Sequence, residues 1–205
     1  MKTSSEPCFT SSHASSCGLV IWLTGLSGAG KSTIANSLNH ELAKAGVSCF
    51  VLDGDDIRSG LNSDLGFSAD DRQENVRRIA HVAKLVSSRG HTVVVAAITP
   101  SHAMRSIARS IVGEAFREVF VDTPITICET RDPKGLYRRA RSGTLKAFTG
   151  VSDLYERPDS PDLVLQTDAL SIAEETGLLL ELIGVEHETN AKASAPPLAP
   201  RAAGE

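Results

Sequence analysis

The sequence predicts an α/β fold, in which a five-stranded parallel sheet is covered by helices on both faces. Short apolar runs recur along the chain, and stretches with helical periodicity separate them. Strands that are apolar throughout are typical of parallel sheets buried on both sides. A glycine-rich segment follows the first run directly. Ligands of such sheets bind beyond the carboxyl ends of the strands, so we expect the functional residues there.

The strands are predicted from uninterrupted apolar runs that are bounded by turn-forming residues. The first run, LVIWLT, stops at the glycine-rich segment, and the third, TVVVAAI, is followed closely by Pro100. The second run, SCFVL, ends at a cluster of aspartates. The five predicted strands cover residues 19–24, 48–52, 92–98, 118–121 and 163–166.

The helices are predicted from periodicity and from their start and stop signals. The first is ended by Gly46. Ser68 and Asp71 form a capping signal for the second, whose apolar residues recur at i, i+3 and i+4 until Gly90. The third follows Pro100. The four predicted helices cover residues 31–45, 68–90, 100–112 and 171–183.

The composition is that of a globular protein and excludes several function classes. The 205 residues are 41% hydrophobic and 22% charged, which predicts one domain at 18–185 between a disordered leader (1–17) and a disordered tail (186–205). Because 25 acidic residues outnumber 21 basic ones, bulk nucleic acid and anionic membranes are excluded as main partners. No apolar run approaches the roughly 20 residues that span a bilayer.

The cysteines favour a reducing environment. None of the four falls in a C-x-x-C pair, and Cys49 and Cys128 lie in apolar surroundings, so we expect buried free thiols. The N-terminal segment lacks the apolar core of a secretory signal. We therefore expect a cytoplasmic protein.

A phosphate-binding loop is the strongest motif in the chain. Residues 25–32 match G-x-x-x-x-G-K-S and lie between a predicted strand and a predicted helix, the context that the motif requires. Backbone N–H groups of such a loop surround a phosphate, Lys31 reaches the β- and γ-phosphates, and the Ser32 hydroxyl can bind Mg²⁺. The chain shows no N-K-x-D guanine motif, which favours a small-molecule kinase.

Charged residues after the second strand suggest an acceptor site. Asp53, Asp55 and Asp56 would lie beside the phosphate loop, where one could hold water on Mg²⁺ and another could orient or deprotonate a hydroxyl. A simple polar turn is the alternative. The arginines of residues 72–78 could grip an anionic substrate or form a solvated charged face.

In these motifs and in their order, the sequence resembles the adenylylsulfate kinase (APS kinase) family. The resemblance implies a P-loop NTPase (nucleoside-kinase-like) fold with a basic lid. It also implies transfer of the ATP γ-phosphoryl group to the 3′-hydroxyl of adenosine 5′-phosphosulfate (APS), with Mg²⁺, in a homodimer linked to a sulfate adenylyltransferase. The segments that carry it span about 18–183: GLSGAGKST (25–33), LDGDDIR (52–58), LGFS with DRQENVRR (65–78), EVFVDTP (118–124), RDPKGLYRRAR (131–141) and FTG (148–150).

The resemblance further implies roles for individual residues. Asp55, Lys31 and Thr99 are expected to be catalytic, with Asp55 nearest the acceptor hydroxyl. Phe67 and Phe148 are expected to sandwich the APS adenine, as aromatic faces stack on bases. The expected APS site is Asp55, Asp56, Ile57, Arg58, Phe67, Arg72, Asn75, Ile98, Thr99, Lys134 and Phe148. The expected ATP site is Gly25, Ser27, Gly28, Ala29, Gly30, Lys31, Ser32, Thr33 and Arg131, with Ser32 and Asp53 as metal ligands.

The expected lid is the basic segment from Arg131 to Gly150. Gly135 and Gly143 could be hinges, and closure would exclude water from the phosphates. A basic surface helix is the alternative. The cationic residues of the segment are Arg131, Lys134, Arg138, Arg139, Arg141 and Lys146.

Two departures from the family pattern leave other functions open. Asp56 stands where the family has Asn in D-G-D-N, and residues 97–102 (AITPSH) replace the typical F-I-S-P-Y-R. These changes could favour a different hydroxyl acceptor. They are also compatible with a catalytically silent nucleotide-binding module.

Overall fold

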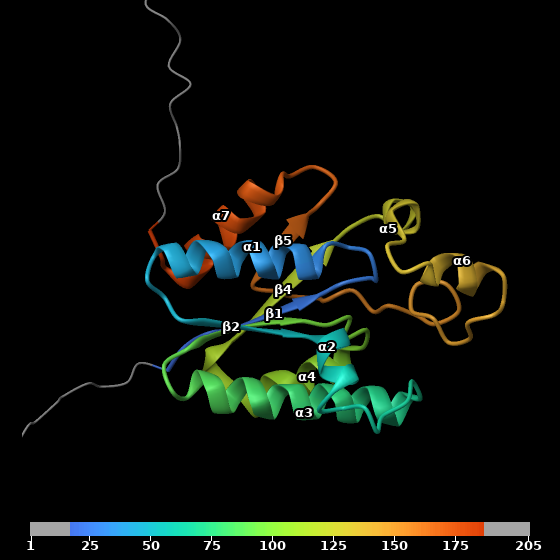
Figure 1. Ribbon diagram of the computed structural model, residues 1–205, viewed down its shortest axis with the longest axis horizontal. Coiled ribbons are helices and arrows are strands. Elements are labelled where there is room, and N and C mark those ends of the chain that lie inside the picture. The colour runs from blue at the N-terminus through green and yellow to red at the C-terminus, as the bar shows by residue number, and fades with distance from the viewer. Residues whose placement is uncertain (1–16, 187–205) are drawn as a thin grey trace, which may run out of the picture.

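The computed structural model describes residues 17–186, so nearly all of the expected leader and tail lies outside the described residues. Within them, five parallel strands form one sheet in the order β2-β3-β1-β4-β5 (Figure 1). The predicted sheet is thereby confirmed. The strands are β1 (Val20–Thr24), β2 (Cys49–Asp53), β3 (Thr92–Ala96), β4 (Phe116–Asp122) and β5 (Leu163–Gln166).

Helices cover both faces of the sheet, as predicted. In Figure 1, α1 and α7 lie on one face, and α3 and α4 lie on the other. Three short helices, α2, α5 and α6, stand at the end of the sheet where the strands finish. The bounds are α1 (Lys31–Lys44), α2 (Gly54–Ser59), α3 (Ala69–Ser87), α4 (His102–Val112), α5 (Ile125–Arg131), α6 (Leu136–Arg141) and α7 (Ile172–Ile183), with a 3₁₀ turn at Gly113–Ala115.

Side chains of the central strand β1 alternate between two apolar cores. Ile21 and Leu23 pack with residues of α1 and α7, whereas Trp22 packs on the side of α3 and α4. The Trp22 ring lies 5.7 Å from the ring of Phe116. All five residues of β1 are buried. The strand that leads into the phosphate loop is therefore held firmly from both faces.

The capping signals explain where the helices begin. The Ser68 hydroxyl oxygen accepts a hydrogen bond from the Asp71 backbone N–H at 3.1 Å, as the sequence predicted. Ser171 and Glu174 form a complete capping box on α7. Helix α2 was not predicted from the sequence; the Asp53 carboxylate caps it by accepting from the Asp55 N–H at 2.9 Å. Helix α5 was not predicted either, whereas α6 lies in the basic segment, for which a surface helix was the alternative to a lid.

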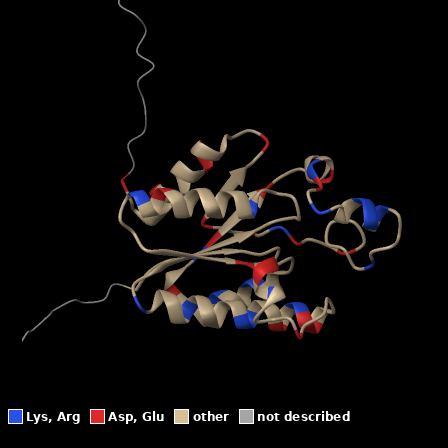
Figure 2. Cartoon of the chain, viewed as in Figure 1, with Lys and Arg blue, Asp and Glu red and all other residues tan. Residues whose placement is uncertain are grey.

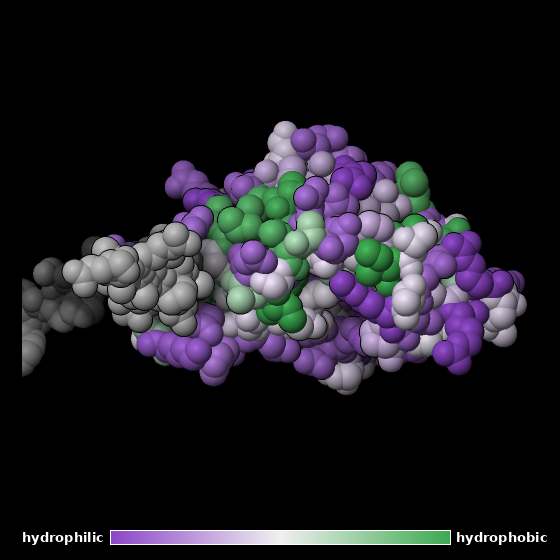
Figure 3. Space-filling model, turned by 90° about the horizontal axis from the view of Figure 1, so that it is seen from above, coloured by the Kyte–Doolittle hydropathy of each residue, from purple (hydrophilic) through white to green (hydrophobic). Residues whose placement is uncertain are grey.

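Surface character differs between the two ends of the molecule. Figure 3 views the side of α1 and α7, where apolar residues gather in patches, while the end that carries α6 is hydrophilic. No helix among residues 17–186 combines the length and the apolar character that a membrane span requires. The thiols of Cys128 and Cys49 are free, and Cys128 is buried as expected, while Cys49 is only half-buried.

Candidate active site

The phosphate loop connects β1 to α1 in a backbone conformation that needs glycine. Gly28 has a φ of +75°, and a Cβ there would lie 3.0 Å from the Cys128 carbonyl oxygen. A Cβ on Gly25 would lie only 2.5 Å from the Val121 carbonyl oxygen. The loop is therefore packed against the end of β4 and against α5.

Lys31, the first residue of α1, folds back over the loop. Its ammonium donates hydrogen bonds to the carbonyl oxygens of Gly25 at 2.9 Å and Leu26 at 2.7 Å. Burial removes water from the amine and lowers the pKa of Lys31 to about 8, although the nearby carboxylates of Asp53 and Asp55 act in the opposite direction. The loop thus holds a positive charge that a phosphate can complement.

This pKa predicts how nucleotide affinity changes with pH. Above pH 8 the amine of Lys31 is increasingly neutral in the nucleotide-free chain, so binding a phosphate must take up a proton. We expect the affinity for ADP to fall above about pH 8, by up to about tenfold per pH unit. Calorimetric titrations from pH 7 to 10, in buffers of different ionisation enthalpy, would measure both the affinity and the proton uptake.

The unfolding free energy should show the matching trend. Between pH 8 and 10.5 the unfolded chain binds more protons at Lys31 than the folded chain, so this residue's contribution to stability rises with pH. In the variant Lys31→Met, we expect neither the fall in ADP affinity above pH 8 nor the rise in stability that Lys31 contributes between pH 8 and 10.5. An ADP affinity that fell equally in this variant would contradict the assignment to Lys31.

Three residues that were not expected at the site support the loop from outside. The Thr123 hydroxyl donates to the Ala29 carbonyl oxygen at 3.0 Å, and the Tyr137 hydroxyl donates to the Ser27 carbonyl oxygen at 2.9 Å. Cys128 packs against Gly28. Thr123 and Tyr137 fall within the VDTP and KGLY motifs quoted above. The sequence alone does not indicate that these two residues contact the phosphate loop.

Arg131 lies beside the loop rather than deep within it. Its Nη1 donates weakly to the Gly28 carbonyl oxygen at 3.4 Å, and its Nη2 donates to the Thr167 carbonyl oxygen at 3.2 Å. The guanidinium therefore spans the phosphate loop and the turn after β5. This place is compatible with the expected position at the ATP adenine.

The two expected metal ligands are adjacent. The Ser32 hydroxyl donates to Asp53 Oδ2 at 2.5 Å, and Asp53 Oδ1 accepts from the Asp55 N–H. Both groups offer the hard oxygen atoms that Mg²⁺ prefers. This chain of hydrogen bonds also joins the phosphate loop to α2, which carries the expected acceptor-side carboxylates Asp55 and Asp56.

Asp55 is paired with the basic segment. Lys134, between α5 and α6, forms an ion pair with the Asp55 carboxylate, although both side chains are more than half exposed. Figure 2 shows the basic helix α6 projecting from the end of the sheet, while the acidic residues of α2 lie closer to the strands. The Asp132 carboxylate accepts from the backbone N–H groups of Tyr137 and Arg138, both at 3.1 Å, and so caps α6.

Arg58 and Phe67 form one wall of the expected acceptor site. The Arg58 guanidinium donates to the Gly66 carbonyl oxygen at 2.7 Å and lies 4.6 Å from the centre of the Phe67 ring. Phe67 is 68% exposed, so this ring is available for stacking. Asp56 is exposed and Ile57 packs against the core on the side of α3.

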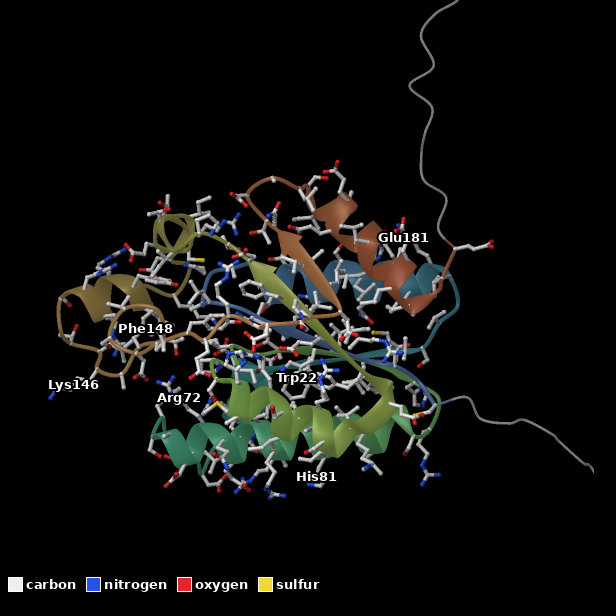
Figure 4. The ribbon with its side chains drawn as sticks, turned by 180° about the vertical axis from the view of Figure 1, so that it is seen from behind. Trp22, Arg72, His81, Lys146, Phe148 and Glu181 are labelled. Atoms are coloured by element: carbon white, nitrogen blue, oxygen red, sulfur yellow. The ribbon has the colours of Figure 1, made fainter. Side chains whose placement is uncertain are left out.

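Arg72 joins this wall to the segment that carries Phe148. Its Nε donates to the Phe67 carbonyl oxygen at 2.9 Å, its Nη1 donates to the Thr149 hydroxyl at 2.9 Å, and its Nη2 donates to the Ala147 carbonyl oxygen. Figure 4 shows Arg72 reaching from α3 toward the loop with Phe148, while Lys146 points away from the body. The Nε, Nη1 and Nη2 groups of Arg72, which we expected to contact substrate, thus donate to protein atoms here.

The remaining aromatic and amide residues are buried. Phe148 is 7% exposed and meets the Tyr137 ring edge-on, with the centroids 5.0 Å apart. Asn75 accepts from the Asn62 side-chain amide at 2.9 Å. The expected sandwich of Phe67 and Phe148 therefore has one exposed ring and one buried ring, on segments that Arg72 connects.

Thr99 is not placed as the sequence analysis expected. Its side chain is only 2% exposed, and its hydroxyl oxygen accepts from the Trp22 indole N–H at 2.9 Å. The preceding residue, Ile98, accepts from the Thr24 hydroxyl at 2.7 Å through its carbonyl oxygen. Because the indole of Trp22 binds the hydroxyl, the Thr99 side chain is directed into the core, while the backbone of the Ile98–Thr99 turn lies beside the start of the phosphate loop.

A cavity of about 880 Å³ lies beside the phosphate loop. It is lined by the ends of β4 and β5 and by residues 150–155, and it includes Leu26 but neither Lys31 nor Asp55. The expected phosphate site is therefore not this cavity but the N-terminus of α1, with the loop N–H groups and Lys31.

Comparison with known proteins identifies the family. The profile of the adenylylsulphate kinase family matches residues 17–166, which is most of the chain. The chain belongs to the adenylylsulphate kinase family. The matched range includes the phosphate loop, α2, the start of α3 and the whole basic segment.

Curated members of the adenylylsulphate kinase family are close in sequence. An adenylyl-sulfate kinase of Paraburkholderia xenovorans is 55% identical over 163 residues, which cover 80% of this chain and 91% of that protein. One from Enterobacter sp. is 53% identical over 167 residues, covering 81% and 83% respectively.

Solved structures of the adenylylsulphate kinase family have the same fold. The Mycobacterium tuberculosis APS kinase in complex with AMPPNP and APS matches with a TM-score of 0.79 and 49% identity, over 82% of this chain and 98% of that one. A gluconokinase from Sinorhizobium meliloti, with a TM-score of 0.55 and 18% identity over 82% and 93% of the two chains, shares the fold alone.

Proposed function

We propose that this chain transfers the γ-phosphoryl group of ATP to the 3′-hydroxyl of APS, giving PAPS and ADP. The observation that carries the proposal is the hydrogen-bonded series from Ser32 through Asp53 to Asp55, which links the donor loop to the acceptor-side helix. It occurs in a chain that is 55% identical to an adenylyl-sulfate kinase.

The donor half binds and orients the triphosphate. The loop N–H groups and Lys31 surround the β- and γ-phosphates, and Arg131 contacts the adenosine side. Ser32 and Asp53 would hold Mg²⁺, which neutralises charge on the phosphates when it is bound.

The acceptor half orients APS against the exposed ring of Phe67 and near Arg58, and Phe148 leaves its contact with Tyr137 to stack on the other face of the adenine. Asp55 accepts the proton of the 3′-hydroxyl, whose oxygen forms the new bond to the γ-phosphorus as the bond to ADP breaks. Before this step Lys134 moves from Asp55 to the phosphates of bound ATP, which offer it more negative charge and leave the Asp55 carboxylate free to take the proton.

A product assay tests this function directly. Purified chain, Mg·ATP and APS should yield PAPS, identified by mass, with ADP formed in equal amount. Other hydroxyl acceptors, such as nucleoside phosphates and sugars, form the comparison. A higher kcat/KM with one of them would overturn the choice of acceptor, and binding of ATP and APS without turnover would indicate a silent module.

The metal site gives a further prediction. In Ser32→Ala the hydroxyl beside Asp53 is lost, so the Mg²⁺ concentration for half-maximal rate should rise by about tenfold or more. Ser37→Ala is the matched control, since Ser37 lies on the same helix and bonds Thr176 instead. An unchanged Mg²⁺ requirement in Ser32→Ala would show that this pair does not hold the metal.

Assembly and location are parts of the same proposal. We expect a homodimer, and a Thiobacillus denitrificans APS kinase described as hexameric, 31% identical with a TM-score of 0.62 over 82% of this chain and 29% of that one, shows that such proteins can assemble. Light scattering would give the mass in solution. The free thiols of Cys49 and Cys128 support a cytoplasmic location. A sulfate adenylyltransferase is the expected supplier of APS.

A further inference from the structure

The turn after β3 has a strained backbone next to the phosphate loop. Thr99 has a φ of +44°, a left-handed conformation that residues with a branched Cβ rarely adopt. Such a conformation persists only where the surrounding structure holds it. The Gly25 N–H also points to this turn and lies 3.4 Å from the Ile98 carbonyl oxygen. Residues that hold this turn in place therefore also help to position Gly25, the first residue of the phosphate loop.

Three side chains hold the two residues of this turn. Trp22 donates to the Thr99 hydroxyl, and Thr24 donates to the Ile98 carbonyl oxygen. The third is Arg105 of α4, whose Nη1 donates to the Thr99 carbonyl oxygen at 3.0 Å. Trp22 and Thr24 belong to β1, so Arg105 is the contact that arrives from outside the sheet.

The guanidinium of Arg105 is itself fixed on its other edges. The residue is 3% exposed, and its Nε lies 2.9 Å from Glu118 Oε1 on β4. Its Nη2 lies 3.1 Å from His102 Nδ1, and its centre lies 6.0 Å from the Tyr155 ring. A planar guanidinium with several N–H groups can face all of these partners at once, which a lysine ammonium cannot do in the same geometry.

Tyr155 extends the network to the segment that returns from the lid. Its hydroxyl lies 2.8 Å from the Thr24 hydroxyl, and its ring stacks on Phe120 with the centroids 5.9 Å apart. Because the Thr24 hydrogen is directed at Ile98, Tyr155 is the donor in this pair. The turn is thus enclosed by β1, by α4 and by residue 155.

We propose that Arg105 is a positioning residue for phosphoryl transfer, which holds the Ile98–Thr99 turn against the phosphate loop and the acceptor site. Its effect on turnover rests on the proposed function, because the acceptor is expected at Ile98 and Thr99. Its effect on the turn itself does not, since the contacts with Thr99, Glu118 and His102 exist without substrate.

Trp22 supplies a reporter that needs no activity. It is the only tryptophan of the chain, it is fully buried, and its indole N–H binds the turn directly. Figure 4 shows it between the sheet and the helices α3 and α4. Displacement of Thr99 would remove this hydrogen bond, so the emission maximum and lifetime of Trp22 report the state of the turn.

Arg109 is the matched control. It also lies on α4 and pairs with Glu118, at 3.1 Å, and its guanidinium lies 4.8 Å from the centre of the Phe116 ring. Arg109→Met therefore removes a cation from the same carboxylate without touching the Thr99 carbonyl. Arg105→Met, Arg105→Lys and Arg109→Met should be compared with the wild-type chain.

We expect both Arg105 variants to shift the Trp22 emission and to reduce kcat/KM for APS by about tenfold to a hundredfold, the range for one charge-assisted hydrogen bond. The KM for ATP should change much less, because Lys31 and the loop N–H groups remain. In Arg109→Met, the emission maximum of Trp22 should not shift, and kcat/KM for APS should stay within about twofold of the wild-type value.

Folding must be separated from positioning. Arg105→Met leaves Glu118 buried without this partner, so if it fails to fold, Arg105→Lys and the double variant Arg105→Met/Glu118→Gln decide the question. Wild-type emission and turnover in a folded Arg105 variant would overturn the proposal, as would equal losses in Arg109→Met. If the wild-type chain does not phosphorylate APS, the proposed function fails, and the Trp22 signal still decides the role of Arg105.

Discussion

Replacing Lys31 by methionine should reduce phosphoryl transfer by about 10²- to 10³-fold, the loss typical of one preorganised donor to a developing charge. The Lys31 ammonium lies inside the phosphate loop and is held there by the carbonyl oxygens of Gly25 and Leu26. A bound phosphate would replace these carbonyls as its partner. The steady-state rate of PAPS formation, at saturating ATP and APS, measures the effect.

The fold should survive this change. The amine of Lys31 is buried, and its lowered pKa shows that the charge is disfavoured in the nucleotide-free chain, so an apolar side chain of similar length fits the same space. Lys44→Met is the control, because Lys44 closes the same helix and only pairs with Glu41. Full turnover by pure, folded Lys31→Met would rule out the proposed phosphate contact.

Replacing Asp55 by asparagine should lower kcat by about 10²- to 10⁴-fold, the contribution of a positioned general base. Asparagine keeps the shape of the side chain but cannot accept the proton of the acceptor hydroxyl. The KM for ATP should stay close to its wild-type value, because the substitution leaves in place the backbone N–H that Asp55 donates to Asp53, which in turn accepts from Ser32. Rapid-quench measurement of a single turnover isolates the chemical step.

Two further variants separate the Asp55 carboxylate from its surroundings. Asp70→Asn removes an exposed carboxylate from the first turn of α3 and should leave the rate unchanged. Lys134→Met removes the partner of Asp55 in the ion pair and should raise the KM for both substrates. Asp55→Asn with wild-type kcat would show that another group takes the proton.

The sequence predicted those features that depend on local pattern. The five strands, the phosphate loop and the Ser68 cap all follow from residues that are close together in the chain. Glycines at 25 and 28 were recognisable because a positive φ or a close backbone contact demands them, wherever the rest of the chain lies. The junction of Ser32 and Asp53 was predictable too, since β1 and β2 end at the same edge of the sheet.

Features that depend on distant partners could not be predicted. Thr99 is buried because Trp22, 77 residues earlier, provides a donor from the neighbouring strand. Arg72 was expected to grip substrate, but residues 147 and 149 occupy its donors. The family pattern identified these positions as important, but the direction in which each side chain points comes from the tertiary structure.

The cap on α6 has a thermodynamic consequence. The Asp132 carboxylate accepts hydrogen bonds from two backbone N–H groups of α6, and the Tyr137 hydroxyl donates one to the phosphate loop. The basic segment is therefore already ordered before a nucleotide binds. A disordered loop would lose conformational entropy when the nucleotide binds. The basic segment has already lost this entropy during folding. Nucleotide association should therefore show a small heat-capacity change, set by the surface of the ligand alone rather than by coupled folding. The lid is expected to close as a preformed body, at little further cost in entropy.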